Sequence, residues 1–362
     1  MNILILTGRF GMGHLSAAES LKQQAQRQFP EAQVTIVDFL EYCAPKLQKT
    51  IYSVFNLLVR KASPLYNLIY RNTAEQDASG VLTRLLLQKM QELLEQQRPK
   101  LVFSTLPLCT QMLSEHKRQT GSTIPLVTCI TDLYAHSDWV SPFCDLYLVA
   151  TPAVKRSLVE QGVAHHAIII GGIPVRDAFL QMVARKTELA PRAARILIMG
   201  GGLGLIPLED DFFELLSRQR GIHTIVITGN NKKAQQELLK KYPNIEVVGF
   251  TQQVHEYMAQ ADLIITKAGG ISTFEAIHAR LPMLVVTPFL EQERWNAEFI
   301  QQHGLGEVLW DKHAPAALRA IELARNPRWQ AQVRANMDEF VRALAPNPIG
   351  QIAQQLAGNA AA

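Results

Sequence analysis

Residues 263–276 read LIITKAGGISTFEA, and this stretch decides the fold class of the chain. Its first four residues, which end at Thr266, form a short apolar run of the kind found in buried strands. Two glycines follow, and the segment after Gly270 opens a helix. A strand that passes through a glycine turn into a helix is the repeating unit of parallel sheets covered by helices. We therefore predict an α/β protein.

The same turn is suited to hold an anion. The N–H groups of Gly269 and Gly270 are not shielded by side chains, and the start of a helix carries positive potential. Ser272 and Thr273 add hydroxyl donors. Glu275 comes one turn into the helix, where its carboxylate can accept paired hydrogen bonds from a ribose diol. The structural alternative for Glu275 is an ordinary acidic residue of a first helical turn.

Strand-like runs alternate with longer amphipathic stretches along the whole chain. The runs are 3–6, 34–37, 101–104, 126–130, 146–150 and 167–170, and then 196–199, 224–228, 245–248, 263–266 and 283–286. Because the second set restarts with a glycine-rich turn, we predict two doubly wound domains. We place these domains at residues 1–175 and 176–335. A C-terminal helical segment, 336–362, follows them and can pack back on the first domain.

The composition agrees with two globular domains. The chain has 362 residues, of which 48% are hydrophobic and 19% are charged, so it can bury large cores. No uncharged run reaches the roughly 18–20 apolar residues of a bilayer-spanning helix, and the first residues lead into a strand pattern rather than a cleavable leader. Four scattered cysteines indicate a reducing compartment. We predict a cytoplasmic protein.

One segment, residues 43–73, carries five basic side chains and no acidic one. Apolar residues recur within it at helical spacing, as in a helix that packs against a core. The second interpretation is a surface that lies on an anionic membrane. Its contact residues would be Lys46, Lys49, Phe55, Arg60 and Lys61. Since the excess of basic residues is confined to this segment, we expect no nucleic-acid partner.

A first glycine-rich loop, GRFGMGH at residues 8–14, follows the apolar run 3–6. Gly11 and Gly13 permit a tight turn into the next helix, as many parallel sheets require. His14 ends this loop at the mouth of the predicted sheet. With a pKa near neutrality, His14 is suited to act as a general base, and a helix-capping or packing role is the alternative.

Two further segments follow strand-like runs in the second domain. Residues 199–204, MGGGLG, place four glycines within five positions. Gly201 and Gly202 leave room for a phosphate or a closely packed partner, or they form only a tight turn. Gln292 and Glu293 lie beyond the last strand-like run, where open α/β sheets bind their ligands, or they belong to a solvated loop. No alternating pair of aspartates is present, so we predict no metal site.

In combination, these segments resemble glycosyltransferase family 28, and within it the diacylglycerol glycosyltransferases: monogalactosyldiacylglycerol synthase and the processive diacylglycerol glucosyltransferases. The resemblance covers most of the chain. It rests on Gly-x-Gly-His ending at His14, TDLYAH at 131–136 with Trp139, GIPV at 172–175, VGF at 248–250 and TKAGGISTFEA at 266–276. One departure is LEQE at 290–293, where the family usually has Pro-Gly-Gln-Glu. This difference leaves the donor sugar open.

The resemblance implies a GT-B fold, in which two Rossmann-like doubly wound domains are separated by an interdomain cleft. It also implies an inverting, metal-independent transfer of a hexose from a UDP-sugar to diacylglycerol. The UDP-sugar is a co-substrate, and no cofactor is expected. The expected partners are a UDP-hexose, a diacylglycerol or related lipid, and an anionic membrane surface. The enzyme would be peripheral on the inner face of the cell membrane.

The resemblance also implies roles for individual residues. On the donor side these are Phe250 beside the base, Gly269, Gly270 and Ser272 around the diphosphate, Glu275 at the ribose, and Gln292 and Glu293 at the sugar. On the acceptor side, His14 activates the acceptor hydroxyl, with Asp132 and His136 nearby. We add Gly201, Gly202, Thr266 and Thr273 to the donor side, and Gly11, Gly13 and Trp139 to the acceptor side.

Three other functions remain open at this point. Two are enzymatic and share the fold: transfer of N-acetylglucosamine from UDP to a polyprenyl-linked acceptor, and epimerisation of a UDP-sugar. The third is a non-catalytic module that lies on a lipid surface. The hexose, the acyl chains of the acceptor and the number of sugars added in succession are not predicted.

Overall fold

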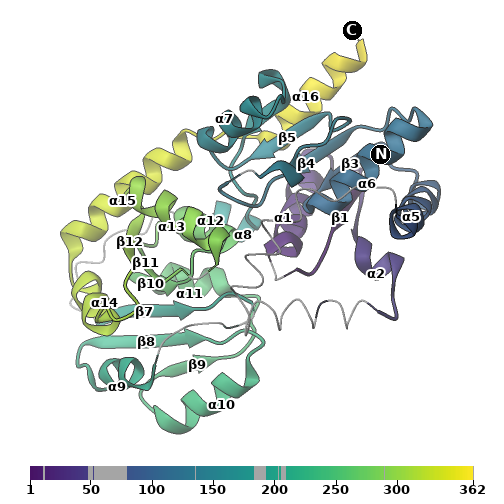
Figure 1. Cartoon of the computed structure of the whole chain (residues 1–362). Coiled ribbons are helices and arrows are strands. Elements are labelled where there is room, and N and C mark those ends of the chain that lie inside the picture. Colours follow the sequence, from purple (N-terminus) through teal and green to yellow (C-terminus); the bar gives the residue numbers. More distant parts are fainter. Residues whose placement is uncertain are drawn as a thin grey trace. The chain divides into compact units, whose positions relative to one another are not determined.

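The chain divides into two compact units, each with its own parallel sheet. One unit comprises Met1–Asp177 and Leu344–Ala362, and the other comprises Ala178–Ala343. The structure is a computed structural model, and Figure 1 shows its elements. It describes residues 1–10, 13–47, 52, 80–134, 136–182, 193–202, 204, 209–288 and 290–361. The two helix-covered parallel sheets confirm the predicted α/β architecture.

The units can be compared with the predicted domains. The expected boundary after Val175 lies two residues before the division at Asp177. The expected boundary after residue 335 falls inside α15 (Pro327–Arg342), whereas the structure divides the chain at Ala343. The difference arises because α15 packs with α12 and α14 of the second unit, and the chain returns to the first unit only after Ala343.

In the first unit, six parallel strands have the order β2-β1-β3-β4-β5-β6. The strands are β1 (Asn2–Thr7), β2 (Gln33–Asp38), β3 (Leu101–Ser104), β4 (Leu126–Cys129), β5 (Leu146–Val149) and β6 (Ile168–Ile170). The helices include α1 (Gly13–Gln28), α2 (Phe39–Cys43), α5 (Val81–Gln97), α6 (Pro107–Thr120), α7 (Pro152–Glu160) and α16 (Pro348–Ala361). The chain passes from β1 outward to β2 and then returns to β3 on the other side. The order of the strands therefore reverses between β1 and β3.

Alternate residues of β1 bind the two layers of helices to this sheet. Ile3 and Ile5 are buried together with residues of α1 and α16. Leu4 and Leu6 are buried together with residues of α5 and α6. Because the strand is covered on both faces, its apolar run is continuous rather than alternating with polar residues.

In the second unit, six parallel strands have the order β12-β11-β10-β7-β8-β9. The strands are β7 (Ala194–Met199), β8 (Ile222–Ile227), β9 (Glu246–Val248), β10 (Leu263–Thr266), β11 (Met283–Val286) and β12 (Gly306–Leu309). The helices include α9 (Asp210–Arg218), α10 (Lys232–Lys241), α11 (Val254–Gln260), α12 (Gly270–His278), α13 (Glu291–Gln302), α14 (Ala316–Ala324) and α15. A short helix, α8 (Asp177–Leu180), lies at the division of the units. Here the strand order reverses between β7 and β10.

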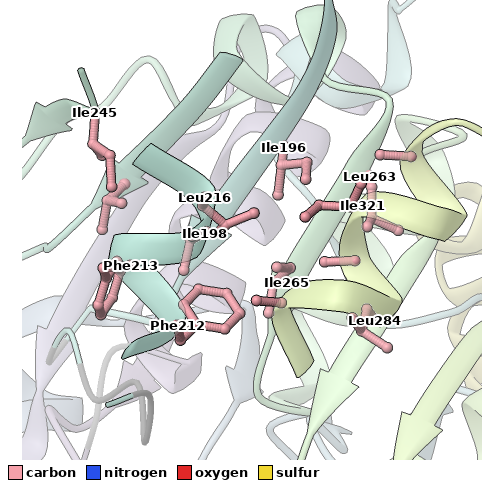
Figure 2. Packing of buried hydrophobic residues seen from close by; sticks show 14 of the residues in the cluster. Ile196, Ile198, Phe212, Phe213, Leu216, Ile245, Leu263, Ile265, Leu284 and Ile321 are labelled. Carbon is pink, nitrogen blue, oxygen red and sulfur yellow. The ribbon is translucent and has the colours of Figure 1, made fainter. Parts of the chain in front are cut away.

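Helices α9 and α14 cover one face of the second sheet. Ile196 and Ile198 of β7 and Leu263 and Ile265 of β10 belong to the same buried cluster as apolar residues of both helices. Figure 2 shows how these side chains fill the layer between the strands and the helices. The aromatic ring of Phe212 in α9 is part of this layer and is 5% exposed. Burial of this kind contributes about 25 cal/mol for each Å² of apolar surface.

The last helix, α16, completes the core of the first unit. Ile349 and Ile352 are each 1% exposed and belong to the cluster that contains Ile3 and Ile5. The N–H of Ala345 donates to the carbonyl of Ile170 at 3.0 Å, which attaches the incoming chain to the end of β6. Within the described residues, no helix has the combination of length and apolar composition that crossing a bilayer requires.

We predict that replacing Ile352 with alanine destabilises the first unit by about 2–5 kcal/mol, because the change leaves a cavity between α16 and the sheet. Urea unfolding followed by circular dichroism measures this change. Gln354→Ala is the matched control, because Gln354 lies on the exposed face of the same helix and should cost less than about 0.5 kcal/mol. Equal unfolding midpoints for the two variants would contradict the docking of α16.

Candidate functional site

The two glycine-rich turns of the second unit meet at one end of its sheet. Strands β7 and β10 are parallel neighbours, and their last residues, Met199 and Thr266, are partners in the register. The turn 200–204 follows β7, and the turn 267–270 follows β10. In open α/β sheets the ligand binds outside the carboxyl ends of the strands where the strand order reverses. Both sequence motifs therefore lie at the position where a ligand is expected.

The turn after β7 requires glycine for steric reasons. Gly201 and Gly204 have φ angles of 68° and 60°, and the N–H of Gly204 donates to the carbonyl of Gly201 at 2.9 Å. A Cβ at Gly204 would overlap the carbonyl oxygen of Thr228, the residue after β8. The turn is therefore packed directly against the backbone of the neighbouring strand end. This close approach fixes Gly201 and Gly202, two of the predicted donor-binding residues.

The turn after β10 is open at the start of α12. Gly269 is the N-cap residue, and a Cβ there would meet no atom within 4 Å. The N–H of Thr273 donates to the carbonyl of Gly269 at 2.9 Å, which closes the first helical turn. The remaining N–H groups of a first turn have no partner inside the helix and carry positive potential. The sequence predicts that an anion binds at this helix start, at Gly269, Gly270 and Ser272, and the exposed backbone there is compatible with that prediction.

Two predicted donor-binding threonines face the interior instead. Thr266 is 1% exposed, and its hydroxyl donates to the carbonyl of Lys267 at 3.1 Å. Thr273 is completely buried, with 0% of its surface exposed. Both side chains are packed around the turn, and their assignment to the donor stays a prediction. A sequence pattern with two adjacent hydroxyl residues, Ser272 and Thr273, does not show which one points inward.

Helix α13 is attached to the turn after β10 by two side chains. The Nζ of Lys267 lies 2.7 Å from the Oε1 of Glu293, and the Nδ2 of Asn296 donates to the carbonyl of Ala268 at 2.8 Å. Glu293, which the sequence places at the donor sugar, is 2% exposed and forms this ion pair. Lys267 and Asn296 have no predicted role in the sequence motifs described above. The sequence feature that could have indicated a role for Lys267 is its position, because a charged residue directly after a buried strand lies at the end of the sheet where ligands bind.

The other donor-side residues lie on separate elements. Glu275 in α12 is 6% exposed, so its carboxylate is largely enclosed. Gln292 is half-buried in the first turn of α13. Phe250 follows β9 and is 55% exposed. Strand β9 is the edge strand beyond β8, so Phe250, which follows β9, lies two strands away from β7 along the sheet.

In the first unit, His14 lies at the corresponding reversal point, near the ends of β1, β3 and β4. It is the second residue of α1, which follows β1. Its Nδ1 lies 2.6 Å from the carbonyl oxygen of Thr105, after β3, and 3.1 Å from the Oγ1 of Thr131, after β4. The hydroxyl of Thr105 donates to the carbonyl of His14 at 3.1 Å. Three strand ends therefore orient this one side chain.

These contacts select the tautomer of His14. A carbonyl oxygen only accepts hydrogen bonds, so the 2.6 Å contact with Thr105 requires a proton on Nδ1. The Thr131 hydroxyl oxygen accepts from the same N–H. The neutral ring then carries its lone pair on Nε2, and the fixed Nδ1–H holds the ring orientation. This arrangement is what a general base requires.

The surroundings of His14 act on its pKa in opposite directions. Burial lowers the pKa of His14 below 6.5, while the negative charge of Asp132 and the Thr105 carbonyl oppose that shift. Asp132 is held by Trp139, whose Nε1 donates to the Oδ2 of Asp132 at 3.3 Å. The predicted group of His14, Asp132 and Trp139 is therefore brought together. At neutral pH the lowered pKa keeps the His14 ring in its basic form.

The remaining acceptor-side predictions have different outcomes. Trp139 is completely buried and donates to Asp132, and its acceptor-side assignment stays a prediction. The Nδ1 of His136 lies 3.4 Å from a carboxylate oxygen of Asp138, and the ring centroids of His136 and Trp139 are 6.3 Å apart. Gly13 is the half-buried first residue of α1. Gly11 lies outside the described residues.

The predicted membrane-contact residues fall mostly outside the part that the structure describes. Lys46, just after α2, is exposed. The others, Lys49, Phe55, Arg60 and Lys61, lie outside the described residues. No group of three His, Cys, Asp or Glu side chains in the described ranges is arranged as a set of metal ligands.

Two family models match the chain in succession. Residues 14–175 match monogalactosyldiacylglycerol (MGDG) synthase, and residues 195–344 match the glycosyltransferase family 28 C-terminal domain. The processive diacylglycerol beta-glucosyltransferase of Staphylococcus carnosus (strain TM300) is 29% identical over 352 residues, which is 94% of this chain and 88% of the relative. The enzyme of that name from Bacillus subtilis (strain 168) is 26% identical over 319 residues, 85% of this chain and 83% of the relative.

Solved structures with the same fold include two glycosyltransferases. MurG of Acinetobacter baumannii gives a TM-score of 0.64 at 15% identity, covering 99% of both chains. Spinosyn rhamnosyltransferase SpnG complexed with thymidine diphosphate gives a TM-score of 0.65 at 17% identity, covering 98% of this chain and 100% of that one. These matches confirm the predicted GT-B fold. The chain belongs to glycosyltransferase family 28, in the group that contains monogalactosyldiacylglycerol synthase and the processive diacylglycerol glucosyltransferases.

Proposed function

We propose that this glycosyltransferase transfers a hexose from a UDP-hexose to diacylglycerol, with inversion and without a metal ion, at an anionic membrane surface. The observation that carries the proposal is the meeting of two glycine turns beside the start of α12, at the reversal point of the second sheet. The relatives named diacylglycerol glucosyltransferases support the acceptor. No cofactor takes part, since the UDP-hexose is a co-substrate.

The donor is bound by the second unit in this proposal. The N–H groups of Gly269 and Gly270 at the start of α12 face the diphosphate, and the turn at Gly201 and Gly202 leaves room for it. Glu275 binds the ribose and Phe250 lies beside the base. As the bond between the anomeric carbon and the diphosphate oxygen breaks, negative charge grows on the leaving UDP. The fixed dipoles of the helix start stabilise that charge.

The acceptor is activated by the first unit. The Nε2 of His14 takes the proton of the free diacylglycerol hydroxyl as its oxygen attacks the anomeric carbon. Attack opposite the leaving UDP inverts the configuration at that carbon. The products are the glycolipid, UDP and a protonated His14 ring, which returns its proton to solvent. The Asp132 carboxylate favours the protonated ring and so stabilises it during the transfer.

Attachment to a membrane is proposed for the basic segment around Lys46. Basic side chains at an anionic surface contribute about 1 kcal/mol each. Several of them are therefore sufficient for reversible binding on the inner face of the cell membrane. Co-sedimentation with vesicles of phosphatidylglycerol, compared with vesicles of phosphatidylcholine, measures this attachment.

Incubation with UDP-glucose or UDP-galactose and diacylglycerol vesicles tests the activity. We expect glycolipid and UDP in equal amounts from one of the two donors, with EDTA present. Conversion of the donor into an epimeric UDP-sugar in the absence of lipid would instead indicate an epimerase. Activity only with UDP-N-acetylglucosamine and a polyprenyl-linked acceptor would replace the proposed substrates.

The pH dependence of turnover reports on His14. We expect kcat/KM to fall at acid pH, with an apparent pKa below 6.5, because the base must be neutral and burial lowers its pKa. Asp132→Asn removes a negative charge that favours the protonated ring, so the pKa of His14 should fall further. The acid limb of the pH profile, where kcat/KM falls, should then move to still lower pH. Asp138→Asn is the control and should leave the limb in place. An acid limb that Asp132→Asn leaves unmoved, or moves to higher pH, would rule out this coupling.

A further inference from the structure

The ion pair between Lys267 and Glu293 places charge inside the candidate donor site. The Nζ of Lys267 lies 2.7 Å from the Oε1 of Glu293, and the two side chains are 19% and 2% exposed. A buried carboxylate is stable only when it is paired and hydrogen-bonded. The ion pair therefore stabilises the buried Glu293 carboxylate, and it also fixes the ammonium group of Lys267 near the end of β10. We infer that this pair has a function in donor binding, an inference that rests on the proposed function.

The Lys267 side chain lies between the two glycine turns. A Cβ placed at Gly201 would lie 3.4 Å from the Cε of Lys267, so this side chain passes close to the turn after β7. The backbone of Lys267 belongs to the other turn, where its carbonyl accepts from the N–H of Gly269 at 2.8 Å. In the sequences 199–204 and 266–272, Lys267 is the only basic residue. It is the basic side chain that these two segments bring to the open start of α12.

Glu293 has a second oxygen with unused capacity. Its Oε2 is buried, and no hydrogen-bond partner for it is found among the described residues. An unsatisfied buried acceptor costs about 1–3 kcal/mol, or more when it is charged, and a ligand hydroxyl recovers that energy. Asn296 on the same helix binds the carbonyl of Ala268, which keeps α13 at a fixed distance from the turn. The free acceptor and the ammonium group are therefore parts of one rigid arrangement.

We propose that Lys267 binds the diphosphate of the donor, and that Glu293, which the family resemblance already places at the sugar, holds the ammonium group in position through the ion pair. An ammonium group has three donors, so Lys267 can keep its bond to Glu293 while it contacts a phosphate oxygen. A helix start alone supplies only about half of an elementary charge. Lys267 adds an ammonium group whose charge is balanced by Glu293 in the free protein. The N–H groups that Glu293 does not use can donate to a phosphate oxygen.

Titration calorimetry with UDP, UMP and UDP-hexose tests this assignment. UDP carries the second phosphate that UMP lacks, so the ratio of their affinities isolates the diphosphate. A charge-assisted hydrogen bond is worth about 1.5–3 kcal/mol, which corresponds to a loss of roughly 10–150-fold. We expect Lys267→Gln to weaken UDP by that factor and to change UMP less than about threefold. Glu293→Gln removes the carboxylate that balances Lys267, so UDP should bind as tightly as before or more tightly, while the additional affinity of the UDP-hexose is lost.

The double variant Lys267→Gln/Glu293→Gln guards against misfolding, because it leaves no unpaired charge in the interior. It should show the UDP loss of the first variant while still binding UMP. Lys240→Gln, at an exposed position in α10, is the matched control and should change neither ligand. An unchanged ratio of UDP to UMP affinity in both Lys267 variants would overturn the inference and leave the proposed function intact. Failure of the unmodified chain to bind UDP would instead overturn the proposed function.

Discussion

Alanine in place of His14 is expected to lower turnover by roughly 10²–10⁴-fold, the usual contribution of a general base. The variant loses the Nε2 lone pair that the bond between Nδ1 and the Thr105 carbonyl makes available. Binding of UDP should be almost unaffected, because the proposed nucleotide site belongs to the second unit. Release of UDP in the presence of diacylglycerol vesicles measures the rate, and calorimetry measures the binding.

His166→Ala is the control for this variant. His166 is an exposed histidine of the same unit, and its replacement should leave both turnover and UDP affinity unchanged. Turnover within about threefold of the unmodified enzyme in His14→Ala would remove His14 from the mechanism. A parallel loss of UDP affinity would show that the change acts through the fold and not through the base.

Alanine in place of Gly204 is expected to destabilise the second unit by about 3 kcal/mol or more. A φ of 60° raises the energy of a residue with a side chain, and the Cβ of that residue would overlap the carbonyl oxygen of Thr228. The turn after β7 must then move, so UDP affinity should fall together with stability. Urea unfolding of the second unit and titration with UDP measure the two effects.

Gly221→Ala separates the two causes. Gly221 also has a positive φ, 73°, but a Cβ there would meet its nearest neighbour, an Nη2 atom of Arg325, at an ordinary 3.7 Å. This variant should lose only the smaller energy of the unfavourable backbone angle, about 1–2 kcal/mol. If Gly204→Ala were no more destabilising than Gly221→Ala, the close packing of the turn against Thr228 would be wrong.

Most of the fold could be predicted because each strand is marked by a pattern of neighbouring residues in the sequence. Strands β7 and β10 are covered on both faces, so each appears in the sequence as a continuous apolar run. These runs, 196–199 and 263–266, end at the same residues as the two strands. Strand β12 was missed. Its sequence, GEVL, contains a glycine and a glutamate, which an edge strand with partly exposed residues tolerates.

The end of the chain shows what local sequence does not contain. The segment after residue 335 was predicted to be one helical unit, but α15 ends at Arg342 and α16 begins at Pro348. Proline residues at 346 and 348 mark the interruption. The point at which the chain returns to the first unit depends on the fit of Ile349 and Ile352 into that core, a contact between distant parts of the sequence.

The candidate site was predicted in part for the same reason. Glycine turns and helix starts are local features, and those around Gly201 and Gly269 lie where the sequence places them. Contacts across long sequence separations were not predictable. Thr105 and Thr131 orient His14 from 91 and 117 residues away, and Lys267 is paired with a residue 26 positions later.

Titration of UDP into the unmodified protein in buffer containing EDTA is the most direct test of the central claim, which is that the second unit binds a uridine diphosphate through its glycine turns and the start of α12. We predict saturable heat of binding with one UDP per chain, and the same affinity when magnesium replaces EDTA. Folded protein that gives no heat with UDP in either buffer would contradict it.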